Sequence, residues 1–337
     1  MSDESEIISR LKARAGVNPD VRVGIGDDAA VIKGADGRDL IACCDLMVEG
    51  VHFQLGWTPP RLLGRKALAV SLSDVAAMGG TPKFAMVGIA IPHSCSAEFI
   101  DELFDGMFEM ANACKVSIIG GDTSSSRDSL FVDVSVIGEC PGGRAVTRFG
   151  AKQGDRIYVS GSLGASALGL KLLEDGFRLD DSKDTRDSTW HQAVLKHLSP
   201  QPHLKLGRAI GEAGVATAMI DISDGLSTDL WHILEASGCG AVIKGAALPI
   251  ADCVLSISSN APNASGTDTL KLALDSGEEY ELLFTASADS HEAVAMLSHS
   301  LGVTITEIGE IVDGQGLQLK RNNSLESIQP SGYQHVI

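Results

Sequence analysis

Apolar and polar positions divide the chain into short alternating stretches and longer stretches with helical spacing. Residues 131–137 alternate, with Val132, Val134 and Val136 on one face, which is typical of a half-buried strand. Residues 97–114 show the spacing of an amphipathic helix. Residues 61–78 predict another helix, which is apolar nearly all round from 67 onward and is therefore expected to be buried.

The other expected elements follow the same two patterns. Strands are expected around 21–32, interrupted at Asp27-Asp28, and at 40–44, 48–53, 84–91, 116–119, 156–160 and 216–220. Helices are expected at 6–15, after 164, and at 204–213, 226–236 and 290–301, with two late strands closing the chain and loops at 180–188 and 256–267. Strands and helices alternate in both halves, so the predicted fold class is α/β or α+β.

A Pro-Gly-Gly sequence near the middle of the chain predicts a domain boundary. The length of 337 residues suggests two domains or one large domain. Residues 141–143 are typical of a boundary, and 144–155 of a linker. We therefore expect an N-terminal domain over 1–143 and a C-terminal domain over 144–337.

Composition and charge narrow the possible functions. The formal net charge of −17 repels nucleic acid and anionic membranes, so a phosphate substrate would need divalent cations to bridge it to the protein. The acidic N-terminus is not a signal peptide, and the apolar run 84–91 is too short to span a bilayer. Seven scattered cysteines without C-x-x-C spacing argue against a disulfide framework or a zinc site and favour a cytoplasmic protein.

Aspartates recur where apolar strands end. Such ends occur at Asp27-Asp28, at Asp45, at Asp122 and at Asp221 with Asp224, and Asp74 lies inside the apolar helix. A buried aspartate must be paired, hydrogen-bonded or bound to metal. If these carboxylates gather in space, they form the hard oxygen site that Mg²⁺ and phosphates favour. The alternative is a set of unrelated turn aspartates.

A second glycine-rich stretch leaves two interpretations open. Gly161-Ser162-Leu163-Gly164 follows an expected strand and precedes an expected helix. Such a loop can hold a phosphate at the helix N-terminus, but it lacks the Lys-Ser/Thr ending of a P-loop. Close packing of the helix on the strand is the preferred interpretation.

Six ordered motifs together resemble the thiamine-monophosphate kinase family, which shares a superfamily with aminoimidazole ribonucleotide synthetase. The matching stretches are 24–30 (GIGDDAA), 45–53 (DLMVEGVHF), 66–79 (KALAVSLSDVAAMG), 120–123 (GGDT), 221–226 (DISDGL) and 277–281 (GEEYE). The resemblance implies a two-domain fold of the aminoimidazole ribonucleotide synthetase type, with the N-terminal sheet forming a homodimer and ATP between the domains. It implies ATP-dependent phosphorylation of thiamine monophosphate to thiamine diphosphate.

The resemblance also implies roles for individual residues. Several Mg²⁺ ions would be held by Asp28, Asp45, Asp74, Asp122, Asp221 and Asp224, of which Asp45, Asp122 and Asp221 are the expected catalytic residues. ATP would meet Gly121, Asp122, Arg148 and Ser223, and the thiamine moiety would meet His52, Glu278 and Tyr333. The alternatives are an ordinary strand histidine for His52, a linker charge for Arg148 and a packing role for Tyr333.

One pair of residues departs from the family pattern. The family has Ser or Thr before the aspartate of the second motif, and one hydroxyl helps to hold a metal, but this chain has Cys43 and Cys44. Cys44 is therefore included among the expected metal-site residues, although a neutral thiol is a poor ligand for Mg²⁺. Either a carbonyl or water replaces the hydroxyl, or one metal is bound more weakly.

Two other functions remain as alternatives at this stage. One is an ATP-dependent ligase of the aminoimidazole ribonucleotide synthetase type. The other is a dimer that binds ATP and Mg²⁺ without catalysis, which only Cys43 and Cys44 support.

Overall fold

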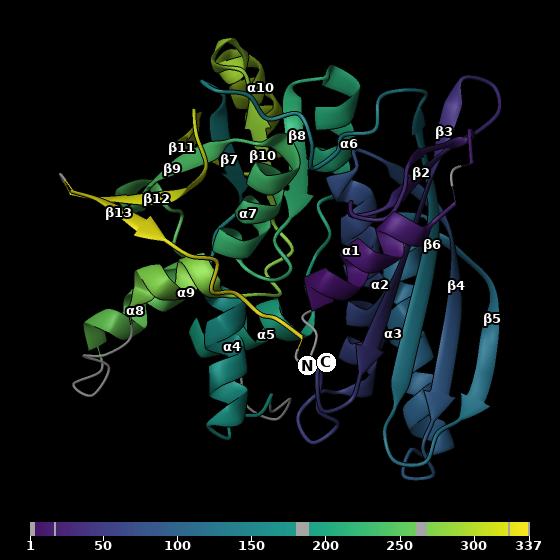
Figure 1. The fold of residues 1–337 in the computed structure, drawn as a ribbon. Helices are drawn as coiled ribbons and strands as arrows, with labels where there is room; N and C mark the ends of the chain where they lie inside the picture. Colours follow the sequence, from purple (N-terminus) through teal and green to yellow (C-terminus); the bar gives the residue numbers. More distant parts are fainter. Residues whose placement is uncertain (1–3, 17, 180–188, 261–267, 323, 336–337) are drawn as a thin grey trace.

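Two β-sheets, each covered by helices, make up the described part of the molecule. The computed structural model describes residues 4–16, 18–179, 189–260, 268–322 and 324–335. The two sheets stand side by side, with helix α2 (Pro60–Ala77) running between them (Figure 1). The predicted mixed α/β class is confirmed.

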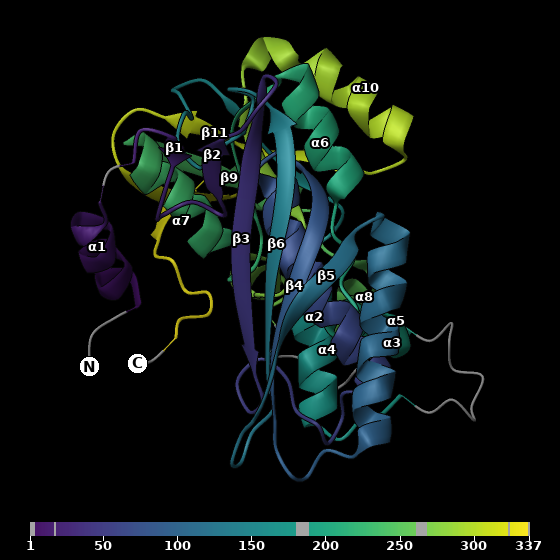
Figure 2. The same cartoon turned by 90° about the vertical axis from the view of Figure 1, so that its right-hand side faces the viewer.

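The N-terminal sheet has the order β1-β2-β3-β6-β4-β5. Its strands are β1 (Val21–Val23), β2 (Ala30–Lys33), β3 (Arg38–Val48), β4 (Thr81–Ile91), β5 (Ser117–Ser125) and β6 (Phe131–Pro141). Helices α2 and α3 (Ala97–Cys114) lie behind this sheet, and no described helix covers the face of β3, β6 and β4 that is turned to the viewer in Figure 2. The short helix α1 (Glu4–Arg14) lies to one side.

The C-terminal sheet has the order β13-β12-β9-β11-β7-β10-β8. Its strands are β7 (Arg156–Ser160), β8 (Ala216–Asp221), β9 (Gly240–Lys244), β10 (Leu282–Ala286), β11 (Ile305–Val312), β12 (Gly316–Arg321) and β13 (Ser324–Ile328). The helices of this half are α4 (Ala165–Glu174), α5 (Thr189–Leu198), α6 (Leu204–Ala213), α7 (Leu226–Ser237), α8 (Asp252–Asn260), α9 (Thr269–Asp275) and α10 (His291–Leu301). No described helix is long and apolar enough to cross a membrane.

Helix α2 joins the two halves because it buries side chains on nearly every side, as its apolar sequence predicts. Leu68, Leu72 and Val75 are fully buried. The helix contacts β3 and β6 of the N-terminal half and β8 and α6 of the C-terminal half. Gly207 of α6 permits this approach, since a Cβ there would lie 2.1 Å from the carbonyl oxygen of Ala76. Residues near the end of α2 can therefore face both halves.

Several expected boundaries were wrong. Strand β3 continues through Asp45 to Val48, and β5 continues through the Gly-Gly-Asp motif to Ser125. Residues 49–53 form a turn rather than a strand, in which the Gly50 amide donates to the Phe53 carbonyl. Helix α8 covers the start of the expected loop at 256–267, and three late strands are present instead of two.

The two sheets separate in sequence between β6 and β7, that is, between Pro141 and Arg156. The division into 1–143 and 144–337 stays a prediction. The expected loop at 180–188, and the part of the other expected loop beyond 260, lie outside the described residues.

Candidate functional site

Three carboxylates from distant parts of the sequence meet at the junction of the two halves. Asp28 lies in the loop between β1 and β2, Asp74 in the last turn of α2, and Asp221 at the end of β8. One carboxylate oxygen of each lies within 4.8 Å of those of the other two. We call these residues the acidic cluster. Asp45 of β3 adjoins it, because Asp45, Asp74 and the Cys43 thiol also lie within 4.8 Å of one another.

Burial and mutual repulsion raise the pKa values in this cluster. Burial, followed by the charges of Asp45 and Asp221, raises the pKa of Asp74 well above its usual range. Burial and the charge of Asp28 raise the pKa of Asp221 to about 7, although Ser73 donates a hydrogen bond to its Oδ2 at 2.5 Å. Groups with such shifts that stand together in a cavity are candidates for a functional site.

Part of the cluster has no hydrogen-bond donor. Among the described residues, Asp28 Oδ2 and Asp45 Oδ2 are shielded from solvent and accept no hydrogen bond. Leaving a buried carboxylate oxygen without a partner is costly. These oxygens therefore fit a divalent cation, whose ligands in proteins are carboxylate oxygens and water.

Arg148 is the cation beside the cluster. Its Nη2 lies 2.7 Å from Asp28 Oδ1, and its backbone amide donates to both carboxylate oxygens of Asp27. Arg148 thus binds Asp28 through its guanidinium group and Asp27 through its backbone amide. The arginine balances only part of the negative charge, since within the described part of the chain no ion pair joins Asp74 or Asp221 to a cation.

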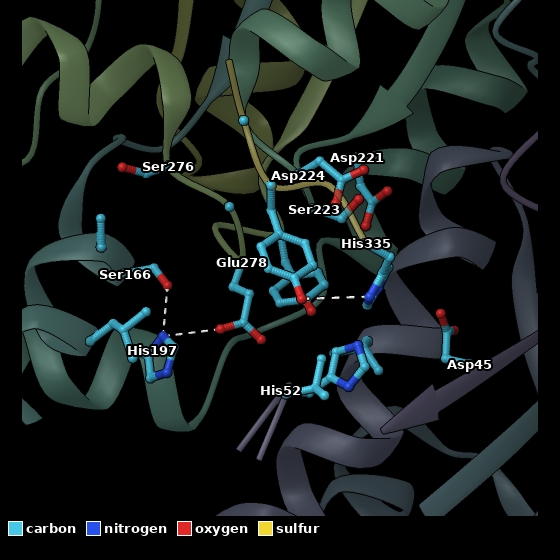
Figure 3. A pocket seen from close by; sticks show the side chains of 18 of the residues that line it. Asp45, His52, Ser166, His197, Asp221, Ser223, Asp224, Ser276, Glu278 and His335 are labelled. Carbon is cyan, nitrogen blue, oxygen red and sulfur yellow. Dashed lines mark hydrogen bonds and ion pairs between the residues drawn. The ribbon is translucent and has the colours of Figure 1, made fainter. Parts of the chain in front are cut away.

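Two members of the acidic cluster, Asp74 and Asp221, line a pocket of about 550 Å³. The pocket contains eight of the residues that the sequence predicted for metal, ATP or thiamine: Asp45, His52, Asp74, Asp221, Ser223, Asp224, Glu278 and Tyr333. Figure 3 shows that Asp45 and His52 come from one side of the pocket, whereas Asp221, Ser223, Asp224 and Glu278 come from the other. The pocket is therefore built from both halves of the chain.

A polar network that the sequence did not predict fixes Glu278. The buried Lys66 ammonium lies 2.7 Å from Glu278 Oε1, and His197 Nδ1 lies 3.2 Å from Glu278 Oε2. Ser166 Oγ lies 3.1 Å from the same histidine nitrogen (Figure 3). Burial and then the charge of Lys66 lower the pKa of His197 to about 4, so this histidine is neutral near neutral pH.

Only Lys66 gave a sequence signal that could have revealed this network. A lysine within the apolar face of α2 needs a buried partner, as Asp74 does. His197 and Ser166 lie on ordinary amphipathic helices, so their sequence context does not mark them.

The C-terminal tail covers one side of the pocket. The Tyr333 amide donates to the Asp224 carbonyl, and the Gly332 amide donates to Thr228 Oγ1. The Tyr333 ring is 46% exposed and lies edge-on to His335, whose ring is 5.2 Å from that of His52. His335 is a pocket residue that the sequence did not predict.

His52 lies in the turn after β3 rather than on a strand. Its Nδ1 accepts a hydrogen bond from the Val48 amide at 3.0 Å. This bond fixes the ring against the turn and places it at the pocket wall. Burial and then the charge of His335 lower the pKa of His52.

Asp122 and Cys44 do not join the acidic cluster within one chain. Directly paired residues of neighbouring strands share a face, and Asp122 pairs with Gly88, which pairs with Asp133. Cys44 donates to that same Asp133 at 3.0 Å, whereas its neighbours Cys43 and Asp45 face the cluster. The expectation that Cys44 is a metal ligand stays a prediction, and the alternation of β3 places Cys43 rather than Cys44 beside the acidic cluster.

Close packing against β4 requires glycine at position 121. It pairs with Val87, and a Cβ on Gly121 would lie 1.8 Å from the Val87 carbonyl oxygen. Gly121 and Asp122 are both exposed on β5 and do not line the pocket.

The second glycine-rich stretch is occupied by a protein carboxylate. Glu279 Oε1 accepts hydrogen bonds from the amides of Gly164 and Ser166, at the start of α4. The carboxylate takes the place that a phosphate would need. The packing interpretation of this stretch is supported.

A second cavity, of about 460 Å³, is bordered by the loop that carries Asp27. Its lining includes Lys12, Val21, Gly24, Ile25, Gly26, Asp27 and Phe149. The Phe149 ring is 68% exposed and offers a free aromatic face. Asp74 and Asp221 of the acidic cluster therefore border the first cavity, and Asp27, the sequence neighbour of Asp28, borders the second.

Comparison with known proteins identifies the family. The family described as AIR synthase related protein matches through its N-terminal domain at residues 26–140 and through its C-terminal domain at 152–322. The thiamine-monophosphate kinase of Bacillus subtilis (strain 168) is 37% identical over 335 residues, which cover 99% of this chain and 99% of that protein. The thiamine-monophosphate kinase of Escherichia coli (strain K12) is 37% identical over 317 residues, which cover 94% and 92%.

Solved structures agree with the sequence relatives. The structure described as "AaThiL complexed with AMPPCP and TMP" has a TM-score of 0.84 and 28% identity, covering 99% of this chain and 97% of that chain. The thiamine-monophosphate kinase from Stenotrophomonas maltophilia K279a has a TM-score of 0.77 and 35% identity, covering 95% and 98%. The chain belongs to the AIR synthase related family and, within it, to the thiamine-monophosphate kinases.

Proposed function

We propose that the chain transfers the terminal phosphoryl group of ATP to thiamine monophosphate, which gives thiamine diphosphate and ADP. Relatives named for this reaction align with nearly the whole chain, and a structure with AMPPCP and TMP shares its fold. The observation that carries the proposal is that the acidic cluster and its neighbours Asp27 and Asp45 border two cavities. Asp45, Asp74 and Asp221 line the first cavity, and Asp27, next to Asp28, lines the second.

The two cavities suit the two substrates. Thiamine carries a cationic thiazolium ring, which suits the first cavity because Glu278 and the exposed face of Tyr333 line it. His52 forms part of the same wall. The second cavity, with its exposed Phe149 ring beside Arg148, suits a nucleobase. The phosphates of both substrates would then meet at the acidic cluster.

We further propose that Asp28, Asp45, Asp74 and Asp221 hold Mg²⁺, with Asp224 and Ser223 beside them. The unpartnered oxygens of Asp28 and Asp45 support this assignment. When bound, Mg²⁺ neutralises phosphate charge and aligns the reacting groups. Arg148 adds a fixed positive charge next to the ATP phosphates, held in place by Asp28.

The transfer needs no strong general base, because the acceptor is a phosphate that is already ionised. We therefore propose direct in-line transfer without a phosphoenzyme. The chain's part is to position both phosphates and to balance their charge. Rapid-quench experiments during turnover should trap no phosphate on the protein, and covalent phosphoprotein would contradict direct transfer.

We also propose a homodimer formed through the uncovered face of the N-terminal sheet. Leu40, Leu46, Phe84 and Met86 are each at least 40% exposed on this face (Figure 2). Asp122 lies on the same face, so its expected role would depend on the dimer. Sedimentation should show a dimer for the unchanged chain and a monomer for Leu46→Arg. A monomeric unchanged chain would contradict the proposal.

The cytoplasm is the proposed compartment, because the seven cysteines are all unpaired.

A coupled assay of ADP release tests the reaction itself. Release is expected with thiamine monophosphate, and much less with thiamine, which lacks the acceptor phosphate. Formylglycinamidine ribonucleotide, the substrate class of the related ligases, serves as the second control. Release with that compound and none with thiamine monophosphate would overturn the proposed function.

A further inference from the structure

The side chain of Cys43 packs against the apolar core and also lies beside two carboxylates. Cys43 and Asp45 are two residues apart on β3 and therefore share a face, and Asp74 approaches them from α2. The Cys43 Sγ and one oxygen of each carboxylate lie within 4.8 Å of one another. The thiol donates to the Ser71 carbonyl at 3.2 Å, which fixes the sulfur beside the two aspartates.

An independent observation points to a ligand for this group. Asp45 Oδ2 is shielded from solvent and accepts no hydrogen bond from the described residues. The Ser71 hydroxyl of α2 donates to the Val134 carbonyl at 2.9 Å. The unsatisfied oxygen lies on the side chain that, with Cys43 and Asp74, forms the group.

We propose that Cys43, Asp45 and Asp74 form a mixed sulfur and oxygen site that binds Zn²⁺ in preference to Mg²⁺. Zn²⁺ takes thiolate and carboxylate ligands together, whereas Mg²⁺ takes oxygen ligands alone. On binding, the zinc–sulfur bond forms, the sulfur–hydrogen bond breaks and the proton passes to water. No electron is transferred.

The spacing of the three atoms suits a zinc ion. Zinc–sulfur bonds of about 2.3 Å and zinc–oxygen bonds of about 2.0–2.2 Å place tetrahedral ligands roughly 3.5 Å apart. Atoms within 4.8 Å of one another need to approach by little more than an ångström. Asp45 and Asp74 line the first cavity, so the fourth ligand position is open to the pocket.

The site shares Asp74 with the acidic cluster proposed for Mg²⁺. Zn²⁺ bound by Cys43 would occupy two carboxylates that the kinase reaction needs. It is therefore expected to inhibit the reaction in competition with Mg²⁺. This consequence depends on the proposed function, but zinc binding itself does not.

Cadmium absorption tests the binding. Metal-free protein is titrated with Cd²⁺ without nucleotide, and the thiolate-to-cadmium band in the ultraviolet is followed. The unchanged chain and Cys44→Ser should show the band, because Cys44 faces Asp133 on the other side of β3. Cys43→Ser should lose it and bind Cd²⁺ about tenfold or more weakly, as expected on losing a ligand. A band that survives Cys43→Ser, or that disappears in Cys44→Ser, would overturn the proposal.

A second measurement needs no variant of the site. X-ray absorption of the unchanged chain and of Cys44→Ser, each loaded with one equivalent of Zn²⁺, should show one sulfur neighbour and otherwise oxygen. Zinc with no sulfur neighbour would overturn the proposal even if Cys43→Ser does not fold. Kinase activity with Mg²⁺, measured on the same preparation, tests the proposed kinase reaction separately from the proposed zinc site. An active enzyme without a cadmium band contradicts only the zinc site, and a band on an inactive enzyme contradicts only the kinase.

Discussion

Two groups of acidic side chains near the pocket are held in opposite ways. In the acidic cluster, Asp28, Asp74 and Asp221 lie within 4.8 Å of one another, and Arg148 pairs with only one of them. Glu281, a few residues after Glu278, lies 2.6 Å from the Lys196 ammonium, 2.5 Å from His203 Nε2 and 2.6 Å from Ser160 Oγ. The Glu281 carboxylate is therefore paired with a lysine, a histidine and a hydroxyl, whereas Arg148 is the one cation paired with the described acidic cluster.

The pKa values express this difference. Burial works to raise the pKa of both groups, and in the cluster the neighbouring charge of Asp28 adds to it, so that the pKa of Asp221 rises to about 7. Around Glu281, the hydrogen bond from His203 and the charge of Lys196 overcome burial and lower its pKa to about 2. Carboxylates with protein cations around them are tied into the fold, whereas carboxylates without such partners are candidates for holding a cation from solution.

Asp45→Asn should give the largest effect on function. The amide keeps the shape but loses the charge that binds Mg²⁺, so turnover should fall by about a hundredfold or more. The metal-free variant should unfold no more easily than the unchanged chain, because one of several repelling charges is gone. Steady-state kinetics at saturating Mg²⁺ and thermal unfolding in chelator check both parts. Full activity would show that Asp45 does not hold the metal.

Glu281→Gln, unlike Asp45→Asn, should reduce the stability of the fold. It leaves Lys196 and His203 without their carboxylate in a mostly buried setting, which should lower the free energy of unfolding by about 3 kcal/mol. Glu307→Gln is the matched control, because the Lys244–Glu307 pair is more exposed and should contribute at most about 1 kcal/mol. Denaturant unfolding compares the two variants. Equal losses would mean that burial does not distinguish these pairs.

The metal-free protein should lose stability as pH rises from about 4 to about 7. In that range native Asp221 keeps a proton that the unfolded chain, with a pKa of 3.8, has released, so the native state binds more protons. Burial raises the pKa of Asp27 and of Asp224 to about 6, which adds to the loss. Each group contributes at most about 1.4 kcal/mol per pH unit. Glu281 has the opposite effect: its stabilisation is lost as pH falls from 4.5 towards about 2.

A chelator series tests this pH dependence. Unfolding is measured between about pH 4 and pH 8, with chelator and with added Mg²⁺. Mg²⁺ should stabilise the protein more at the high end, because it replaces the missing positive charge. Asp221→Asn should flatten the chelator profile. A profile that rises from pH 4 to pH 7 in chelator would contradict the assignment of the cluster.

Much of the fold could be predicted because local pattern and tertiary packing agree. Helix α3 has the predicted bounds, since its amphipathic spacing begins after Ser96, whose hydroxyl accepts from the Phe99 amide. Residues 48–53 were wrongly predicted to form a strand because Val-Glu-Gly-Val-His-Phe alternates like one. In the structure Gly50 adopts a φ of +86°, and the chain turns there. Strand β9 was missed because only its pairing with β11 and β12 defines it.

The candidate site was predictable where a single strand end carried the signal. Asp45 and Asp221 come directly after apolar runs of sequence, although β3 continues past Asp45 and β8 ends at Asp221, and Asp74 interrupts an apolar helix. The face of Asp122 could not be predicted, because it depends on a register shift between β4 and β5. Lys66 and His197 meet through Glu278 from far apart in sequence, and no local pattern encodes that contact.

Tyr333→Ala should give the smallest effect and separates two roles for the tail. If the exposed ring binds the cationic thiazolium, a contribution of roughly 0.5–2 kcal/mol should raise the KM for thiamine monophosphate several-fold. The KM for ATP should change little, because the second cavity does not include Tyr333. Tyr333→Phe should be mild, since the one hydrogen-bond partner of the hydroxyl among the described residues is His335 Nδ1, at 3.5 Å.

The alternative is that Tyr333 only anchors the tail. The Tyr333 and Gly332 amides already bond to Asp224 and Thr228, and an alanine keeps those backbone bonds. Anchoring by the ring would therefore appear as a lower melting temperature with both KM values unchanged. Measuring both constants and the melting temperature on one preparation decides between the two roles. Because the tail's backbone is held independently of the ring, a selective rise in KM for thiamine monophosphate would assign the ring to the substrate.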